Sequence, residues 1–530
     1  MSQERYHIDA FKGEVVLPHE GLEQWSRRTP RKPALIFGNE SLSYEAFWHR
    51  IVSLAQGLRL YGVRKGERVL MVSVNHPAFL ETYFACSLLG AIFVPLNFRL
   101  AVPEALFQIN DAHPLVLILG PDQQERGEAL SSEVGLPRER IFLVSQHTSW
   151  SRDFNELINE GASLTRDLPL PTLGPEDPQM IMYTSGTTGI PKGALLPYRK
   201  TYYNNLNAEV FFELTSDDCV LVPVPLFHSL GLNILSLPVL FRGGTVVLLE
   251  RFDEETTLEA LQTCRATFMG AVPTIYKRLI DFGLEGYDLS SLRFCFTAGA
   301  PIPVSLIEEY HRRGLLMKQG FGQTETSILC CLDASDAIRK AGSVGKSVAY
   351  ADVRLVDENL DDVRPGQVGE IVARGPIVML GYWNRLEETS AVLYDGWLHT
   401  QDLGVKDSEG FITLVGRKSD MYISGGENIY PEEIEKVYQG HPWVEEVAVM
   451  GIPDVDLGET GLACIIPTPG AVLSDHELRD YARGKIASYK IPHRFVFLEA
   501  LPKTVTGKVQ KYLLRETIYG RHKTNDDTGP

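Results

Sequence analysis

Short apolar runs that favour β-strands alternate with helical patterns over the first 170 residues, and this alternation restricts the fold more than any other feature. Residues 68–74, 91–96 and 114–119 are such runs, and residues 79–90 have a helical pattern. Alternation of this kind predicts βαβ units and a parallel sheet covered by helices on both faces. The pattern continues through residues 244–249, 266–270 and 292–297. We therefore expect an α/β fold with doubly wound sheets.

The length of the chain predicts more than one domain, since 530 residues exceed what one hydrophobic core usually serves. After about residue 345 the apolar runs become shorter and are separated by glycines, which favours a small β-barrel. A polar, charged break at residues 416–420 precedes a further unit. We expect a large N-terminal domain over residues 1–418 and a small α+β domain over residues 419–530.

Composition limits the partners and the location. The net charge is −17, from 51 basic and 68 acidic residues, and no long Lys/Arg block is present. This balance argues against a nucleic-acid partner and a polybasic membrane anchor. Seven scattered cysteines without zinc-like spacing favour a reducing cytoplasm. Residues 222–241 are apolar, but their three prolines, His228 and Asn233 favour a buried segment over a transmembrane one. Peripheral membrane contact and a homodimer stay open.

A loop at residues 183–193 carries five hydroxyl side chains, three glycines and Lys192, directly after the strand-like residues 179–184. Glycines allow a ligand to approach the backbone, while hydroxyl groups, N–H groups and a lysine suit anionic oxygens. A Walker-type loop is excluded because Pro191 stands where that motif requires glycine. The loop therefore predicts a polyphosphate site of another type, with a flexible linker as the alternative.

Three further polar clusters share this character. Residues 297–301 follow an apolar strand, which is where α/β folds bind ligands. Residues 320–325 offer Phe321 for stacking on a base, Thr324 for a phosphate and Glu325 for Mg²⁺, which favours oxygen ligands. The third cluster, residues 396–404, contains Asp402, which could accept hydrogen bonds from ribose hydroxyls. Each cluster taken alone is equally well explained as a structural turn.

Taken together and in this order, the clusters resemble those of the adenylate-forming family of acyl-CoA synthetases, luciferases and peptide-synthetase adenylation domains. The resemblance extends from about residue 20 to residue 517. Its matching blocks are residues 183–193, 227–228, 297–301, 320–325, 395–402, 416–420, 424–431 and 501–508.

The resemblance implies a two-step reaction with ATP, Mg²⁺ and coenzyme A. A carboxylate attacks the α-phosphate of ATP to give an acyl-adenylate and pyrophosphate, and the thiol of coenzyme A then displaces AMP. The implied catalytic residues are Lys508, His228, Thr324 and Glu325, and the implied metal ligands are Thr184 and Glu325. The implied ATP-binding residues are Thr184, Ser185, Gly186, Thr187, Thr188, Gly189, Lys192, Gly299, Ala300, Pro301, Gly320, Phe321, Gly322, Gln323, Thr324, Asp402, Arg417 and Lys508.

Lys508 is far in sequence from the other implied groups and would reach them only if the small domain closed over the large one. The resemblance therefore implies a mobile C-terminal domain. The family often has Asp or Lys at the pivot, whereas this chain has Ser419. A small residue can still absorb the torsional change of a hinge.

The acyl-pocket segments favour an apolar acid. Residues 228–235, 269–276 and 327–330 contain no charged side chain, and an unpaired buried charge would be penalised. A medium- or long-chain fatty acid is the first choice, with an aryl or alicyclic acid next. The implied pocket residues are His228, Leu232, Ala271, Thr274 and Ile328, and a core histidine is the alternative for His228.

The expected acceptor is free coenzyme A. The resemblance places it near Gly425, Gly426 and Glu427. A separate expectation is that Arg99 meets a phosphate of coenzyme A, with a surface arginine as the equally good alternative. The alternatives are a carrier-protein thiol, oxygen as in luciferases, or a catalytically inactive homologue that only binds nucleotide.

Overall fold

A computed structural model describes residues 14–144, 148–164, 169–184, 191–300, 302–424, 427–455, 457–503, 507 and 509–523. The described residues fall into two compact units. Unit 1 takes those within Met1–Ser185, Pro191–Val353 and Ala373–Leu398. Unit 2 takes those within Arg354–Val372 and His399–Pro530. The domain boundary between residues 418 and 419 stays a prediction.

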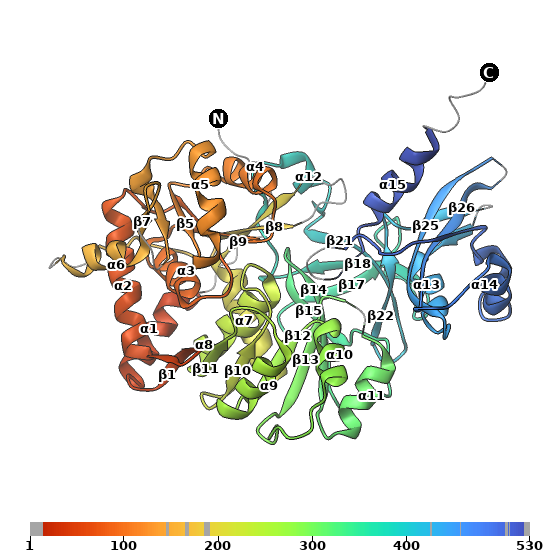
Figure 1. Cartoon of the computed structure of the whole chain (residues 1–530), viewed down its shortest axis with the longest axis horizontal. Helices are drawn as coiled ribbons and strands as arrows, with labels where there is room; N and C mark the ends of the chain where they lie inside the picture. The colour runs from red at the N-terminus through yellow and green to blue at the C-terminus, as the bar shows by residue number, and fades with distance from the viewer. Residues whose placement is uncertain are drawn as a thin grey trace. The chain divides into compact units, whose positions relative to one another are not determined.

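The first sheet of unit 1 has eight strands in the order β19-β9-β8-β4-β3-β5-β6-β7. Figure 1 labels β5, β7, β8 and β9 of this sheet. The strands are β3 (Arg68–Val72), β4 (Ile92–Leu96), β5 (Val116–Leu119), β6 (Ile141–Leu143), β7 (Arg152–Asp153), β8 (Pro178–Thr184), β9 (Lys192–Pro197) and β19 (Gly381–Tyr382). The predicted strands at 68–74, 91–96 and 114–119 are β3, β4 and β5, and they pair in parallel. Strands β8 and β9 form an antiparallel hairpin that flanks the predicted phosphate loop.

The second sheet of unit 1 has nine strands in the order β16-β15-β14-β13-β12-β10-β11-β1-β2. The strands are β1 (Pro33–Phe37), β2 (Glu40–Ser43), β10 (Cys219–Val222), β11 (Thr245–Leu248), β12 (Phe268–Ala271), β13 (Phe294–Ala298), β14 (Met317–Gln323), β15 (Ser327–Leu332) and β16 (Lys346–Ser347). Its centre is parallel, as the apolar runs predict, whereas β14, β15 and β16 pair antiparallel.

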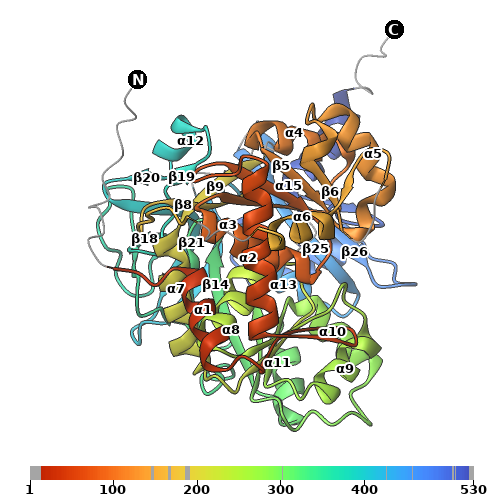
Figure 2. The same cartoon turned by 90° about the vertical axis from the view of Figure 1, so that its left-hand side faces the viewer.

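Helices cover these sheets, and Figure 2 shows α1 and α2 side by side at the front of unit 1. The helices of unit 1 are α1 (Pro18–Arg28), α2 (Tyr44–Leu60), α3 (Pro77–Leu89), α4 (Val102–Ala112), α5 (Gln124–Glu133), α6 (Phe154–Ala162), α7 (Tyr198–Phe212), the π-helix Leu230–Ser236, α8 (Leu237–Arg242), α9 (Glu254–Thr263), α10 (Pro273–Phe282), α11 (Val304–Arg312) and α12 (Leu386–Ser390).

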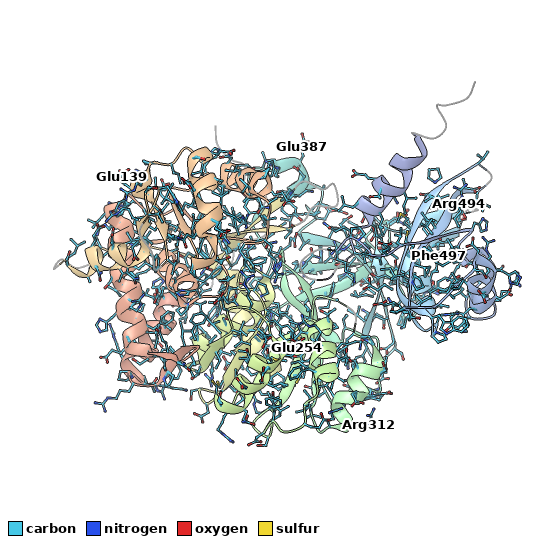
Figure 3. All side chains as sticks on the ribbon, viewed as in Figure 1. Glu139, Glu254, Arg312, Glu387, Arg494 and Phe497 are labelled. Atoms are coloured by element: carbon cyan, nitrogen blue, oxygen red, sulfur yellow. The ribbon has the colours of Figure 1, made fainter. Side chains whose placement is uncertain are left out.

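Helix α3 illustrates how local sequence sets these elements. Pro77 occupies its first turn, where a missing N–H costs nothing, and Gly90 ends it at a φ of 66°. Every residue of α3 is buried, and its one charged side chain, Glu81, pairs with Arg50 of α2. Charged side chains such as Glu139 and Arg312 lie instead at the outside of unit 1 (Figure 3).

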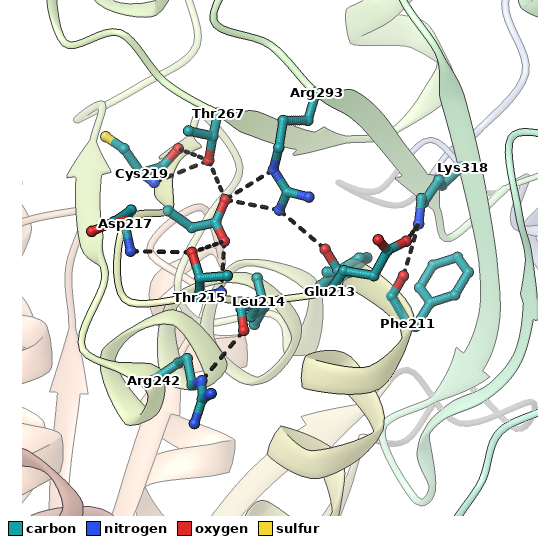
Figure 4. Close-up of polar contacts among 12 residues, drawn as sticks. Phe211, Glu213, Leu214, Thr215, Asp217, Cys219, Arg242, Thr267, Arg293 and Lys318 are labelled. Carbon is teal, nitrogen blue, oxygen red and sulfur yellow. Dashed lines mark hydrogen bonds and ion pairs between the residues drawn. The ribbon is translucent and has the colours of Figure 1, made fainter.

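A polar cluster ties together the amino ends of three parallel strands in the second sheet (Figure 4). Asp218, Thr267 and Arg293 each precede a strand, namely β10, β12 and β13. The buried Asp218 carboxylate accepts from Arg293 Nη2 at 2.8 Å and from Thr267 Oγ1 at 2.6 Å. Because this cluster occupies the amino ends, the carboxyl ends of the same strands are left for a ligand site.

A third sheet of five strands follows, in which β22 pairs with β21. Its strands are β17 (Asp352–Val356), β18 (Val368–Arg374), β20 (Leu393–Tyr394), β21 (Trp397–Lys406) and β22 (Ile412–Arg417). Strands β17, β18 and β22 are the strands that the glycine-rich region after residue 345 predicts, whereas β21 is longer, with ten residues.

The C-terminal part of unit 2 is an α+β structure, as expected. Its strands and helices are β23 (Tyr422–Ser424), β24 (Glu427–Ile429), α13 (Pro431–Gln439), β25 (Val444–Asp454), β26 (Gly458–Pro467), α14 (Asp475–Ala482), β27 (Arg494–Phe497) and α15 (Lys511–Lys523). Two apolar clusters hold it together. One includes Tyr438 of α13 and Leu478 of α14, and the other includes Leu514 of α15.

Among the described residues, no helix combines the length and the apolar composition that a membrane crossing requires. Residues 222–241 form instead the end of β10, the π-helix and most of α8, which are largely buried. The cytoplasmic location and the homodimer stay predictions.

Candidate active site

The carboxyl ends of β12 and β13 bring two predicted segments to one edge of the second sheet. These strands are parallel neighbours, with Ala271 opposite Thr297. Ala271 ends β12 within the predicted acyl segment 269–276, while Gly299 and Ala300 follow β13 directly. Gly299 has a φ of 90°, a backbone conformation that favours glycine. The predicted adenine and acyl residues therefore start from adjacent strand ends, as expected for a ligand site in this type of sheet.

The β14–β15 hairpin presents the predicted phosphate and metal residues next to β13. Gly320 lies opposite Ala298 of β13, and a Cβ at Gly320 would come within 2.7 Å of the Phe296 ring. A Cβ at Gly322 would lie 1.7 Å from the Ser327 carbonyl oxygen. Glycine is thus required by close packing at both positions. The hairpin turn then carries Thr324 and Glu325.

Glu325 is a buried carboxylate, only 6% exposed. Its Oε1 accepts a hydrogen bond from the Tyr382 hydroxyl at 2.8 Å, and its backbone carbonyl accepts from Met379 N at 2.8 Å. The other predicted metal ligand, Thr184, ends β8 opposite Lys192 of β9.

These groups fit a magnesium ion that a nucleotide brings with it. Mg²⁺ is commonly held by one or two carboxylates together with substrate phosphates and water. Within the ranges that the structure describes, no group of three His, Cys, Asp or Glu side chains could hold a metal by itself. The single buried carboxylate of Glu325 matches an ion that is held by one carboxylate, substrate phosphates and water.

Unit 2 brings together the two predicted ribose residues. Asp402 on β21 lies opposite Arg417 on β22 in the antiparallel register. Arg417 Nε is 2.8 Å from Asp402 Oδ1, and Asp402 is 6% exposed. The neighbouring Lys418 donates to the buried Glu370 at 3.0 Å. The arginine thus holds the carboxylate of Asp402 in a fixed orientation.

Three of the predicted acyl-pocket residues lie on elements that pack together. Leu232 of the π-helix and Ile328 of β15 are buried, as is Ala271 at the end of β12, and the π-helix contacts both strands. His228 precedes the π-helix and is partly buried, whereas Thr274 in the first turn of α10 is exposed. The predicted CoA residue Arg99 is exposed, and its guanidinium lies 5.0 Å from the centroid of the Phe98 ring.

Several predicted residues lie outside the described part of the chain, and their roles stay predictions. They are Ser185, Gly186, Thr187, Thr188, Gly189, Pro301, Gly425, Gly426 and Lys508. The side chain of Glu427 is likewise outside it.

Lys200 on α7 is a buried residue that the sequence analysis missed. It is 1% exposed, and its ammonium donates to the Ser327 hydroxyl at the start of β15. Burial lowers the pKa of Lys200 to about 7, an effect that the charge of Glu325 opposes. Residues 327–330 contain no charged side chain themselves, and this lysine reaches them from another element, α7. The Arg199-Lys200 pair at the start of a helix was the only local signal.

Replacing Lys200 with methionine is expected to make the melting temperature less dependent on pH. The folded pKa lies below the ordinary lysine value of about 10.4, so the unfolded chain binds more protons between about pH 7 and pH 10. The free-energy cost of burying the charged Lys200 is fully present below about pH 7. It disappears as the pH rises from about 7 to about 10.

We therefore expect Lys200→Met to melt a few degrees above the wild type at pH 6.5 and to lose this advantage near pH 9.5. Scanning fluorimetry at both pH values measures the difference. Lys277→Met, at an exposed lysine paired with Asp281, is the control. Its melting temperature should differ from that of the wild type by the same amount at both pH values. A pH-independent loss of stability in Lys200→Met would contradict the argument.

Comparison with known proteins places these features in one family. Residues 22–383 match the family described as AMP-binding enzyme, and residues 433–508 match the AMP-binding enzyme C-terminal domain. The chain therefore belongs to the AMP-binding, adenylate-forming enzyme family.

Two curated relatives are similar over nearly their whole length. A feruloyl-CoA synthase from Amycolatopsis sp is 41% identical over 499 residues, covering 93% of this chain and 98% of the relative. An indoleacetate–CoA ligase from Aromatoleum aromaticum is 40% identical over 502 residues, covering 94% and 96%.

Solved structures show the same fold. The o-succinylbenzoate CoA synthetase of Bacillus subtilis with its acyl-adenylate intermediate has a TM-score of 0.83 at 30% identity, covering 93% of this chain and 97% of that chain. The same enzyme in complex with ATP and magnesium ion has a TM-score of 0.82 at 30% identity, covering 93% and 99%. A Mycobacterium tuberculosis fatty acyl CoA synthetase has a TM-score of 0.76 at 31% identity, covering 95% and 99%.

These likenesses confirm the family and the fold class that the motifs predict. They also confirm the expected enzyme class, an AMP-forming acid–thiol ligase that uses ATP, Mg²⁺ and coenzyme A.

Proposed function

We propose that this chain joins an aryl or arylalkyl carboxylic acid to coenzyme A through an acyl-adenylate. The observation that carries the proposal is the identity of 40–41% to a feruloyl-CoA synthase and an indoleacetate–CoA ligase over more than nine-tenths of each chain. The uncharged acyl segments favour a fatty acid first, with an aryl acid as the alternative. The alternative now has the stronger support.

In the first step, a carboxylate oxygen of the acid attacks the α-phosphorus of ATP, and the bond to the β-phosphate oxygen breaks to release pyrophosphate. This chemistry depends on positioning and on charge neutralisation. Lys192 offsets the charge of the leaving phosphates, Thr324 contacts the α-phosphate, and Glu325 with Thr184 would hold Mg²⁺, which supplies further neutralisation when bound. Asp402 accepts from the ribose hydroxyls while Arg417 orients it.

In the second step, the thiol of coenzyme A attacks the acyl carbonyl and AMP leaves, so that the thioester carries no part of the nucleotide. His228 lies at the beginning of the acyl segments and would line the path to the carbonyl carbon. Residues 425–427 would line the path of coenzyme A. The remaining alternative acceptor is a carrier-protein thiol.

A panel of acids tests the proposal. We expect kcat/KM for pyrophosphate release to be at least about tenfold higher with ferulate or indoleacetate than with hexanoate, decanoate or palmitate, because a pocket shaped for a ring discriminates against a flexible chain. Thioester formation with coenzyme A and with a holo-carrier protein is measured in parallel. A saturated chain as the preferred acid, or thioester on the carrier alone, would contradict the proposal.

A further inference from the structure

Tyr382 lies between two groups of the proposed nucleotide site. It belongs to β19, which pairs antiparallel with β9, and it lies opposite Ala194. Its hydroxyl donates to Glu325 Oε1 at 2.8 Å. The ammonium of Lys192 lies 5.5 Å from the centroid of its ring. One side chain therefore contacts both the proposed metal ligand and the lysine of the phosphate loop.

The backbone on both sides of Tyr382 is held by hydrogen bonds. Tyr382 N donates to Thr389 Oγ1 at 2.9 Å, and Trp383 N donates to the Gly193 carbonyl at 2.7 Å. Upstream, Met379 N donates to the carbonyl of Glu325 itself at 2.8 Å. Residues 379–383 are thus fixed to β9 and also to the turn that carries Glu325.

A partly buried aspartate anchors the next part of the same segment. Asp111 of α4 accepts from the Arg385 guanidinium at 2.8 Å and from the Tyr183 hydroxyl at 2.7 Å. Its backbone carbonyl accepts from Trp383 Nε1 at 3.0 Å. Since Tyr183 belongs to β8, these contacts tie the strand before the phosphate loop to the segment of Tyr382. Tyr382 therefore belongs to a segment that hydrogen bonds hold in place, and the elements that hold it also border the proposed site.

We infer that Tyr382 is a positioning residue that orients the Glu325 carboxylate toward a magnesium–nucleotide complex and keeps Lys192 beside it. The inference rests on the proposed function, because that function supplies the nucleotide. A donor on Oε1 fixes the rotation of the carboxylate and leaves Oε2 able to coordinate a cation. The ring face also offers Lys192 a partner other than Glu325. The two charged groups then stay available for the ion and the phosphates.

Tyr382→Phe tests this role because it removes the hydroxyl and keeps the ring. Calorimetry of the whole protein measures the dissociation constant of ATP with and without Mg²⁺, with no acid or coenzyme A present. We expect the gain in ATP affinity on adding Mg²⁺ to fall by roughly tenfold, the lower range for loss of a group that supports a metal ligand. The affinity for ATP without Mg²⁺ should stay unchanged.

Tyr310→Phe is the matched control, since it also removes one tyrosine hydroxyl that donates a hydrogen bond, here to the Tyr276 carbonyl at 2.9 Å. It should leave both dissociation constants unchanged. Tyr382→Leu, which also removes the ring, should in addition weaken ATP binding without Mg²⁺ through Lys192, and it keeps the inference testable if the phenylalanine variant folds poorly.

An unchanged effect of Mg²⁺ in Tyr382→Phe, or an equal loss of ATP affinity with and without Mg²⁺, would overturn the inference. Because no acid is present, either outcome leaves the proposed substrate class untouched. Conversely, failure of the acid panel would overturn the substrate class and leave this binding measurement valid.

Discussion

Lys508→Ala is expected to slow adenylate formation by a factor on the order of 10²–10³ and to leave thioester formation from a supplied acyl-adenylate nearly unchanged. A lysine aimed at developing negative charge in a site from which water is excluded contributes this much to a rate. The family resemblance implies that Lys508 acts only while the carboxylate attacks the α-phosphate. The second step starts from an adenylate that already exists, so it should not need this charge.

Two assays separate the half-reactions of the Lys508 variant. Exchange of pyrophosphate into ATP reports the first, and release of AMP from synthetic acyl-adenylate with coenzyme A reports the second. Lys503→Ala is a suitable control, because Lys503 lies five residues away and pairs with Glu446 at 2.5 Å. It should keep both half-reactions. Equal loss of both in Lys508→Ala would show that the lysine has a general structural role.

The arrangement of the parallel strands could be predicted because it depends on local patterns. The runs at 68–74, 91–96 and 114–119 are mostly apolar, and each contains a largely buried strand of the first sheet. The change from parallel to antiparallel pairing in the second sheet, which occurs between β14 and β15, was not predictable in this way. Its short glycine-rich strand, residues 317–323, has no strong local preference and is stabilised by its neighbours β13 and β15.

The candidate site could be predicted only where residues follow one another in a motif. Glu325, Asp402 and Arg417 were assigned in this way, and the register of β21 and β22 explains why the last two belong together. Lys200 and Tyr382 were missed because they reach Ser327 and Glu325 through tertiary contacts with distant segments. The exposure of Thr274 was likewise not predictable, because it depends on how α10 begins after β12.

Asp402→Ala is expected to lower kcat/KM for ATP by at least about a hundredfold. A hydrogen bond to a charged acceptor contributes about 1.5–3 kcal/mol, and the carboxylate would accept from both ribose hydroxyls. The change also leaves Arg417 without the carboxylate that it contacts at 2.8 Å. We expect the loss to appear mainly in nucleotide binding, because the phosphate and metal groups are on other strands.

A nucleotide that lacks both hydroxyls isolates this effect of Asp402 from any change in folding. The wild type should prefer ATP to 2′,3′-dideoxy-ATP by nearly the factor that Asp402→Ala loses with ATP, and the variant should show little preference between the two. This cycle measures the coupling between the carboxylate and the hydroxyls directly. If Asp402→Ala kept the full preference for ATP, the carboxylate would not contact the ribose, and the Asp402–Arg417 pair would serve only to join β21 to β22.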